Sequence, residues 1–181
     1  MHTLWKTGGL VTFLLILIVG VSHAYDGMPS PEDMGLGYNI TAGAAFSVTG
    51  NTDNTTSPIL GVAWYGPLDP TGGDMAALGL SADWIGIKRN DGEKISLIPI
   101  LLNYKRSGLV GQYRVFVNLG LGIQVATDDI PEMRLDDGAS FAWTGGIGID
   151  ITNNVFAVAK FIGGQHPGED GLASISLGYR F

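Results

Sequence analysis

The chain ends on the stretch "ASISLGYRF", Ala173–Phe181, in which apolar and small polar residues alternate strictly. Odd positions hold apolar or aromatic side chains, and even positions hold serine, glycine or arginine. A period of two predicts a β-strand with one apolar and one polar face. No tail follows this strand, so we expect it to pair with the first strand and to close a barrel that leaves no free edge.

The same alternation recurs about eight times along the chain. The other segments are "YNITAGAAFSVT", "ILGVAWY", "MAALGLSADW", "KISLIPILLNYKR", "GQYRVFVNLGLGIQVA", "FAWTGGIGIDIT" and "VFAVAKFI". In the last of these we place Val155 and Phe161 outward, because this turns Lys160 inward. In the fourth, Ile95 and Leu97 are out of phase with the residues that follow, which predicts a bulge near Pro99.

The connections between these segments fall into two classes. Counted from the first strand, the odd connections are polar, acidic and mostly longer: "NTDNTTS", "RNDGE", "TDDIPEMRLDDG" and "GGQHPGED". The even connections are "GPLDPTGG", "SGL" and "TNN". Short turns on one side and longer loops on the other are typical of bacterial outer-membrane barrels. We therefore predict an all-β protein, an eight-stranded antiparallel up-and-down transmembrane β-barrel over residues 37–181.

The N-terminus has the three regions of a secretory signal peptide. Lys6 precedes the apolar run "LVTFLLILIVGV", and the small residues Ser22 and Ala24 follow it. The run is shorter than the ~20 residues of a spanning helix, so we predict a signal peptide over residues 1–24 and a short periplasmic lead-in over 25–36. Cleavage leaves nine basic and seventeen acidic residues, a net charge of −8, which argues against a nucleic-acid partner. The chain has no cysteine, which excludes disulfides and thiolate metal sites.

The polar faces carry about one charge per strand, too few for a surface in water. Their other residues are small, as the crowded interior of an eight-stranded barrel requires. Aromatic residues lie near the ends of the apolar faces, as in membrane-interface girdles. We therefore expect the polar faces to point inward, with structural ion pairs among the lumen charges. These are Asp83, Lys105, Arg114, Asp150, Lys160 and Arg180. The alternative is a soluble barrel whose apolar faces form the core.

Four stretches carry a resemblance to a known family: "GLGYNITAGAAF", "IPILLNYK", "VNLGLGIQV" and the terminal "SLGYRF". With them the chain resembles small bacterial outer-membrane β-barrel proteins of the OmpA-like transmembrane-domain superfamily. The resemblance implies location in the bacterial outer membrane after export. It also implies that the outward residues of the last strand act as the signal for the outer-membrane assembly machinery. These residues are Ile175, Leu177, Tyr179 and Phe181.

Few residues of the sequence suggest a catalytic or metal-binding role. Lipid A-modifying barrels use a histidine with a serine near the outer rim, but no serine lies two residues from His166, and Pro167 follows it. We read His166 as a solvated loop residue. The acidic loop "TDDIPEMRLDDG" lacks EF-hand spacing. Its carboxylates are either a plain acidic surface or a bridge through cations to lipopolysaccharide. We expect no catalytic residues, no cofactor and no resident metal site.

The sequence thus predicts a non-enzymatic outer-membrane barrel with a structural, envelope or surface-interaction role. Its expected partners are outer-membrane lipid, lipopolysaccharide and the assembly machinery. The alternatives are a small pore or a hydrophobic-ligand conduit, a lipid A-modifying enzyme, and a soluble lipocalin-like ligand binder. A constricted lumen would count against the pore.

Overall fold

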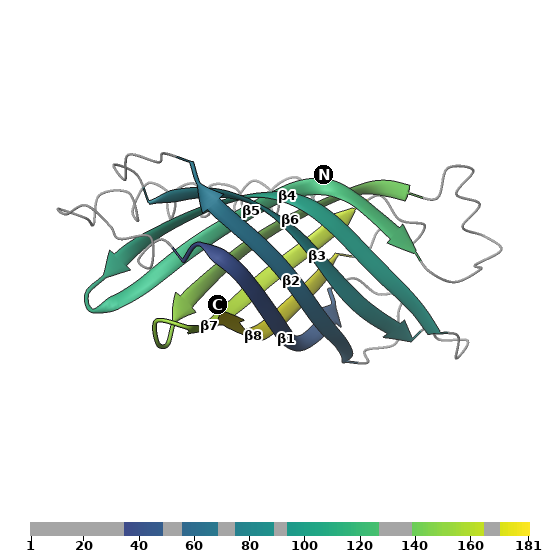
Figure 1. Ribbon diagram of the computed structural model, residues 1–181. Helices are drawn as coiled ribbons and strands as arrows, with labels where there is room; N and C mark the ends of the chain where they lie inside the picture. Colours follow the sequence, from purple (N-terminus) through teal and green to yellow (C-terminus); the bar gives the residue numbers. More distant parts are fainter. Residues whose placement is uncertain (1–34, 49–55, 69–74, 89–93, 127–138, 165–170) are drawn as a thin grey trace, which may run out of the picture.

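The computed structural model describes residues 35–48, 56–68, 75–88, 94–126, 139–164 and 171–181. Within these ranges the chain forms one closed barrel of eight strands, each antiparallel to its neighbours (Figure 1). The predicted fold class is confirmed. The strands are β1 (Gly37–Ser47), β2 (Ser57–Pro67), β3 (Ala76–Lys88), β4 (Lys94–Val110), β5 (Tyr113–Ala126), β6 (Ala139–Asp150), β7 (Val155–Gly164) and β8 (Leu172–Arg180).

The barrel closes where its last strand pairs with its first. The β1–β8 register runs from Asn39 opposite Arg180 to Ser47 opposite Leu172. Beyond the ladder, the Phe181 amide donates to the Tyr38 carbonyl at 3.0 Å. Every strand therefore has a partner on both sides, and neither β1 nor β8 presents an open edge.

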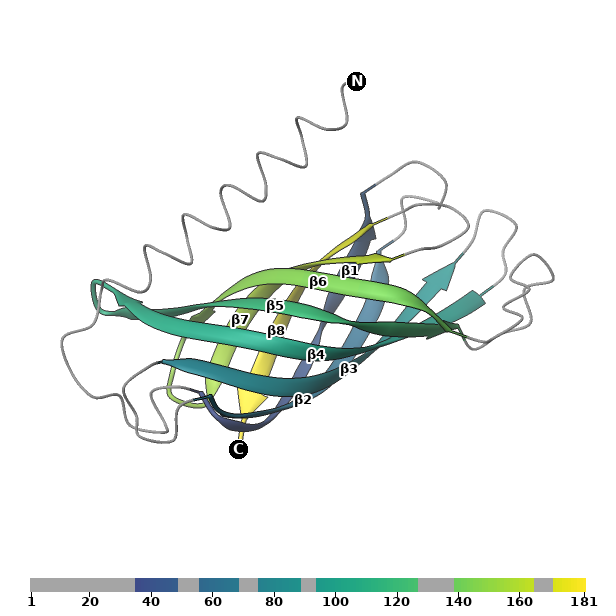
Figure 2. The same cartoon turned by 90° about the horizontal axis from the view of Figure 1, so that it is seen from above.

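The two ends of the barrel differ in their connections. The turn end, as we call it, carries the β2–β3, β4–β5 and β6–β7 connections together with Gly35 and Phe181. The loop end carries the other four connections, which fall largely outside the described residues. Figure 2 shows the barrel turned by 90°, with the strands running between these two ends. The predicted signal peptide and residues 25–34 also lie outside the described ranges.

The outer surface of the barrel is apolar. Large hydrophobic side chains alternate with buried residues along the strands and remain exposed; Leu121 is 62% and Ile175 63% exposed. Aromatic residues are exposed near the turn end, among them Tyr38, Tyr113 and Phe181. Among the described residues, no helix is long and apolar enough to cross a membrane.

The predicted bulge near Pro99 is wrong. Ala82 lies opposite Ile100 and Ile85 opposite Leu97, so the β3–β4 register is the same on both sides of Pro99. The side chains of Ile95 and Leu97 are buried inside the barrel. In the sequence they look out of phase with the outward apolar residues that follow. The reason is that the interior at the loop end is itself apolar, so inward positions there also carry hydrophobic side chains.

The position of one predicted turn is also wrong. The stretch "SGL" is part of β4, which continues to Val110, and the turn consists of Gly111 and Gln112. Gly111 has φ = 63°, in the left-handed region that glycine adopts readily. The strand continues because Ser107 to Val110 still pair with Phe116 to Tyr113 on β5.

Candidate functional site in the barrel interior

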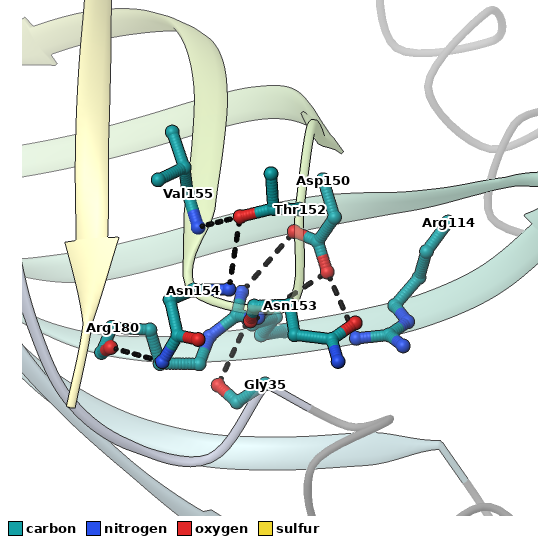
Figure 3. A network of polar contacts seen from close by, with 9 residues as sticks. Gly35, Arg114, Asp150, Thr152, Asn153, Asn154, Val155 and Arg180 are labelled. Carbon is teal, nitrogen blue, oxygen red and sulfur yellow. Dashed lines mark hydrogen bonds and ion pairs between the residues drawn. The ribbon is translucent and has the colours of Figure 1, made fainter.

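An ion-pair network fills the interior at the turn end (Figure 3). The carboxylate of Asp150, at the end of β6, accepts from the Arg114 guanidinium on β5 at 3.1 Å. Its two oxygens also accept from the two terminal nitrogens of Arg180 on β8, at 3.2 and 3.3 Å. All three side chains are at most 15% exposed. One carboxylate thus links three of the strands.

The β6–β7 turn orients this network. The Thr152 hydroxyl accepts from the Val155 amide at 3.0 Å, as threonine side chains do in tight turns. The Asn153 carbonyl accepts from the Arg180 guanidinium at 3.1 Å. The Asn154 side chain donates to the Arg180 carbonyl at 2.9 Å. The turn therefore holds both the backbone and the side chain of Arg180 beside the barrel seam.

Lys105 has a different environment. Its ammonium donates to the Gly35 carbonyl at 3.1 Å and lies 4.6 Å from the centre of the Phe116 ring. The Tyr65 ring is the next nearest, at 5.1 Å. Within the described residues, Lys105 forms no ion pair with a carboxylate. A buried ammonium in this position is stabilised by the carbonyl dipole and by cation–π contacts.

A second ion pair spans the middle of the interior. The Lys160 ammonium on β7 donates to both oxygens of Asp83 on β3, at 3.1 and 3.2 Å. These strands lie on opposite sides of the eight-stranded ring, so the pair crosses the lumen. Gly61 on β2 leaves the space for Asp83, because a Cβ at Gly61 would lie 2.1 Å from its Oδ1 atom.

The described residues enclose a small cavity in the middle of the interior. A cavity of about 30 Å³ is lined by residues that include Tyr65, Asp83, Lys105 and Lys160. This volume holds one or two water molecules. Asn118, which also lines it, has a buried side-chain oxygen without a hydrogen-bond partner. The cavity therefore fits water rather than an organic ligand.

Two phenylalanine rings lie over glycines of the neighbouring strand. Phe116 pairs with Gly148 and Phe156 pairs with Gly178. A Cβ at Gly148 would lie 2.1 Å from the Phe116 ring, and one at Gly178 2.2 Å from the Phe156 ring. The two rings meet edge to face, with centroids 5.8 Å apart. Glycine at these two positions thus lets the rings fold down over the wall of the barrel.

We expect Gly148→Val to lower the free energy of unfolding by about 1–3 kcal/mol, because the new side chain displaces the Phe116 ring. Unfolding in urea, followed by the ratio of folded to unfolded bands on unheated gels, measures the loss. Phe116→Ala should cost less stability in the Gly148→Val protein than in the parent, because the added side chain takes up part of the space that the ring leaves. Gly111→Asn is the control, because a Cβ there meets nothing within 4 Å and asparagine tolerates the left-handed region. An equal loss of unfolding free energy in Gly148→Val and Gly111→Asn would contradict this account.

An apolar cluster lies in the interior at the loop end. Its buried members come from six strands: Ala45, Ile59, Ile85, Ile95, Leu97, Ile162 and Leu172. Ile87 and Ala126 pack against it. Close-packed aliphatic side chains exclude water from the space that they occupy. We call this cluster the apolar plug.

All six lumen charges predicted from sequence point inward, and three ion pairs between described residues join five of them. The predicted assembly-signal residues Ile175, Leu177, Tyr179 and Phe181 are exposed on the outer face. His166 and the acidic loop lie outside the described residues. In the described part of the chain, no three side chains of histidine, aspartate or glutamate are grouped to hold a metal ion.

Sequence reasoning missed the two aromatic side chains that face Lys105 and the apolar plug. For Phe116 the sequence did hold an indication, because this residue falls on the polar face of its strand. In the structure it lies opposite Gly148. The plug could have been suspected from the out-of-phase Ile95 and Leu97 at the start of β4.

No protein-family model and no curated protein sequence matches the chain. Among solved structures, the chain is similar to the outer-membrane enzyme PagL, with 14% identity, a TM-score of 0.59, and 79% of this chain and 98% of that chain covered. The fold is that of the small outer-membrane β-barrels. The Yersinia pestis outer-membrane protein Ail shares 15% identity over 80% of this chain and 98% of its own, with a TM-score of 0.52. Neisserial surface protein A has 13% sequence identity to the chain, with 80% of this chain and 94% of that chain covered and a TM-score of 0.52. At these identities the likeness describes the fold alone.

Proposed function

We propose that the protein is a non-enzymatic integral protein of the bacterial outer membrane, with a structural, envelope or surface-interaction role and a closed lumen. The observation that carries the proposal is an apolar outer surface around an interior that is occupied by side chains at both ends and in the middle. The turn end and the middle are filled by ion pairs, and the loop end is filled by the apolar plug.

The outer surface supports insertion into lipid. A barrel in water would place its polar residues outward, whereas here the outward side chains are leucine, isoleucine, valine and aromatics. Paired strands without an open edge satisfy the backbone in hydrocarbon. The OmpA-like resemblance, the signal peptide over residues 1–24 and the outward residues of β8 support export and recognition by the assembly machinery.

The interior argues against a pore. A water-filled porin lumen is wide and polar, whereas the described cavity here is about 30 Å³. The lumen charges are engaged with one another across the barrel, which supports a structural role for them. We propose that contact with lipopolysaccharide or other surface partners falls to the four connections at the loop end.

The first test of this proposal is electrophoresis of the detergent-solubilised protein with and without boiling. We expect the unheated protein to resist SDS and to migrate differently from the boiled form, because a closed barrel keeps its hydrogen bonds. Recovery from the aqueous fraction without a mobility shift would overturn the membrane assignment and favour a lipocalin-like binder.

The second test is conductance in planar lipid bilayers. We expect no stepwise channel currents from the folded protein, because the apolar plug excludes water. A porin reconstituted by the same protocol is the positive control. Regular current steps that scale with the number of inserted barrels would establish the pore instead.

A further inference from the structure

The outer face of the described strands carries charged residues on β3 and β4, and all of them are basic. Lys88 lies on β3, and Lys94 and Arg106 lie on β4. By the alternation of each strand they share the outward phase of the exposed Trp84 and Ile100. The whole sequence is acidic, with a net charge of −7. The basic character of this face is therefore a local feature of β3 and β4, not a consequence of composition.

The two lysines occupy directly opposed positions at the loop end. The β3–β4 register places Lys88 opposite Lys94, two positions beyond Gly86 on the outer face of β3. The Trp84 ring lies over Gly86, because a Cβ there would be 3.1 Å from the ring. Tryptophan is enriched where hydrocarbon meets the headgroups, so the lysine positions are on the headgroup side of this ring. Like charges in directly opposed positions are destabilising, and the pair therefore favours an anion between them.

Arg106 lies on the outer face of β4 near the turn end. It is opposite Ala76 on β3 and Val117 on β5. Tyr104, two positions before it on the same face, is of the aromatic type that lies at membrane interfaces. An arginine stem can cover apolar surface while its guanidinium reaches the headgroups, and a guanidinium binds phosphate in a bidentate geometry. Arg106 is thus suited to a headgroup phosphate at the turn end.

The spacing of the basic positions matches the thickness of a bilayer. Lys94 and Arg106 are twelve positions apart on β4. At about 3.3 Å per residue and a strand tilt of about 40°, this separation spans roughly 30 Å across the membrane. The hydrocarbon core is itself about 30 Å thick. The outward residues between the two include Ile98, Ile100 and Leu102, so the basic positions fall on either side of an apolar band.

We propose, on the basis of the membrane location proposed above, that this face of β3 and β4 binds phosphate groups of membrane lipids at both interfaces. Lys88 and Lys94 hold a lipid phosphate at the loop end, and Arg106 holds one at the turn end. A phosphate between the opposed lysines offsets their repulsion. Contacts at both ends of one face fix the depth of the barrel in the bilayer.

Titration of the folded protein with phosphatidylglycerol in micelles of a neutral detergent, followed by native mass spectrometry, tests the lysine pair. We expect Lys94→Gln to weaken phosphatidylglycerol binding about fivefold, the effect of one basic residue at an anionic membrane surface. Lys94→Arg should bind as the parent does, because the charge remains. Arg134→Gln, the same charge change in the β5–β6 connection, is the matched control and should not alter the affinity. Unchanged binding in Lys94→Gln, or an equal loss in Arg134→Gln, would overturn the proposal.

The same titration with Arg106→Gln tests the contact at the turn end. We expect a loss of about fivefold there as well, and a larger loss when Lys94→Gln is added, because the two contacts lie in different leaflets. Arg106→Lys should retain most of the affinity. If Arg106→Gln binds phosphatidylglycerol as tightly as the parent, contacts at both interfaces are excluded, and the proposed fixing of depth is overturned.

Inorganic phosphate and gel mobility separate the remaining outcomes. Inorganic phosphate has no acyl chains, so we expect a large excess of it to leave the bound phosphatidylglycerol in place. Displacement by phosphate would assign the site to a soluble anion and overturn the lipid contact. Electrophoresis with and without boiling reports the closed barrel independently of lipid binding. A heat-dependent mobility with unaltered lipid binding in the variants would contradict the lipid contact alone, whereas the absence of a mobility shift would contradict the proposed membrane location.

Discussion

Asp150→Asn is expected to lower the free energy of unfolding by about 3–5 kcal/mol, the usual loss when one partner of a buried ion pair is removed. The substitution keeps the shape of the side chain and removes its charge. Arg114 and Arg180 would then share a buried site without the carboxylate that accepts from both. Because Arg180 also joins the β6–β7 turn to the barrel seam, we expect the seam to open first.

Urea unfolding in lipid vesicles, read from the folded and unfolded gel bands, measures this loss. Asp137→Asn, the same chemical change in the acidic loop, is the control and should lie within about 0.5 kcal/mol of the parent. The loss in Asp150→Asn should persist at high salt, since buried pairs are screened much less than exposed ones. A loss below about 1 kcal/mol, of the size found for exposed pairs, would mean that the network is solvated.

The strand pattern could be read from the sequence wherever the two faces differ in polarity. Along β5, for example, Leu121 and Ile123 alternate with Gly120 and Gly122, and the structure places the first pair outside. At the start of β4 the contrast disappears, because Ile95 and Leu97 face an apolar interior while Ile98 faces outward. There the alternation does not define the phase of the strand, and a bulge was predicted where the register stays the same.

The charged residues were found from sequence, but their partners were not. Arg114 and Asp150 are 36 residues apart, and Lys160 and Asp83 are 77 apart. Which acid meets which base depends on the stagger of neighbouring strands around the barrel, which a single strand does not encode. The contact of Lys105 with Gly35 likewise depends on how the chain enters β1.

The cross-lumen pair of Asp83 and Lys160 gives the second large expected effect. Lys160→Met should destabilise the barrel by about 3–5 kcal/mol, because Asp83, which is 2% exposed, keeps its charge without its partner. Adding Asp83→Leu should recover most of that loss. Phe116, Phe156 and Val158 pack together nearby and line the same cavity, so an apolar pair has apolar neighbours there.

The parent, Lys160→Met, Asp83→Leu and the double variant form a double-mutant cycle. If the double variant is more stable than Lys160→Met alone, the cost arises from the unpaired carboxylate, and the charges are not needed to hold β3 and β7 together. If its loss of stability equals the sum of the losses in the two single variants, the two side chains act independently and the ion pair contributes no coupling between opposite walls. In both cases we expect no channel currents, because Ile59, Ile85 and Leu97 still fill the loop end in series with the altered layer. Currents in the double variant alone would show that the ion pair, rather than the apolar plug, keeps the lumen closed.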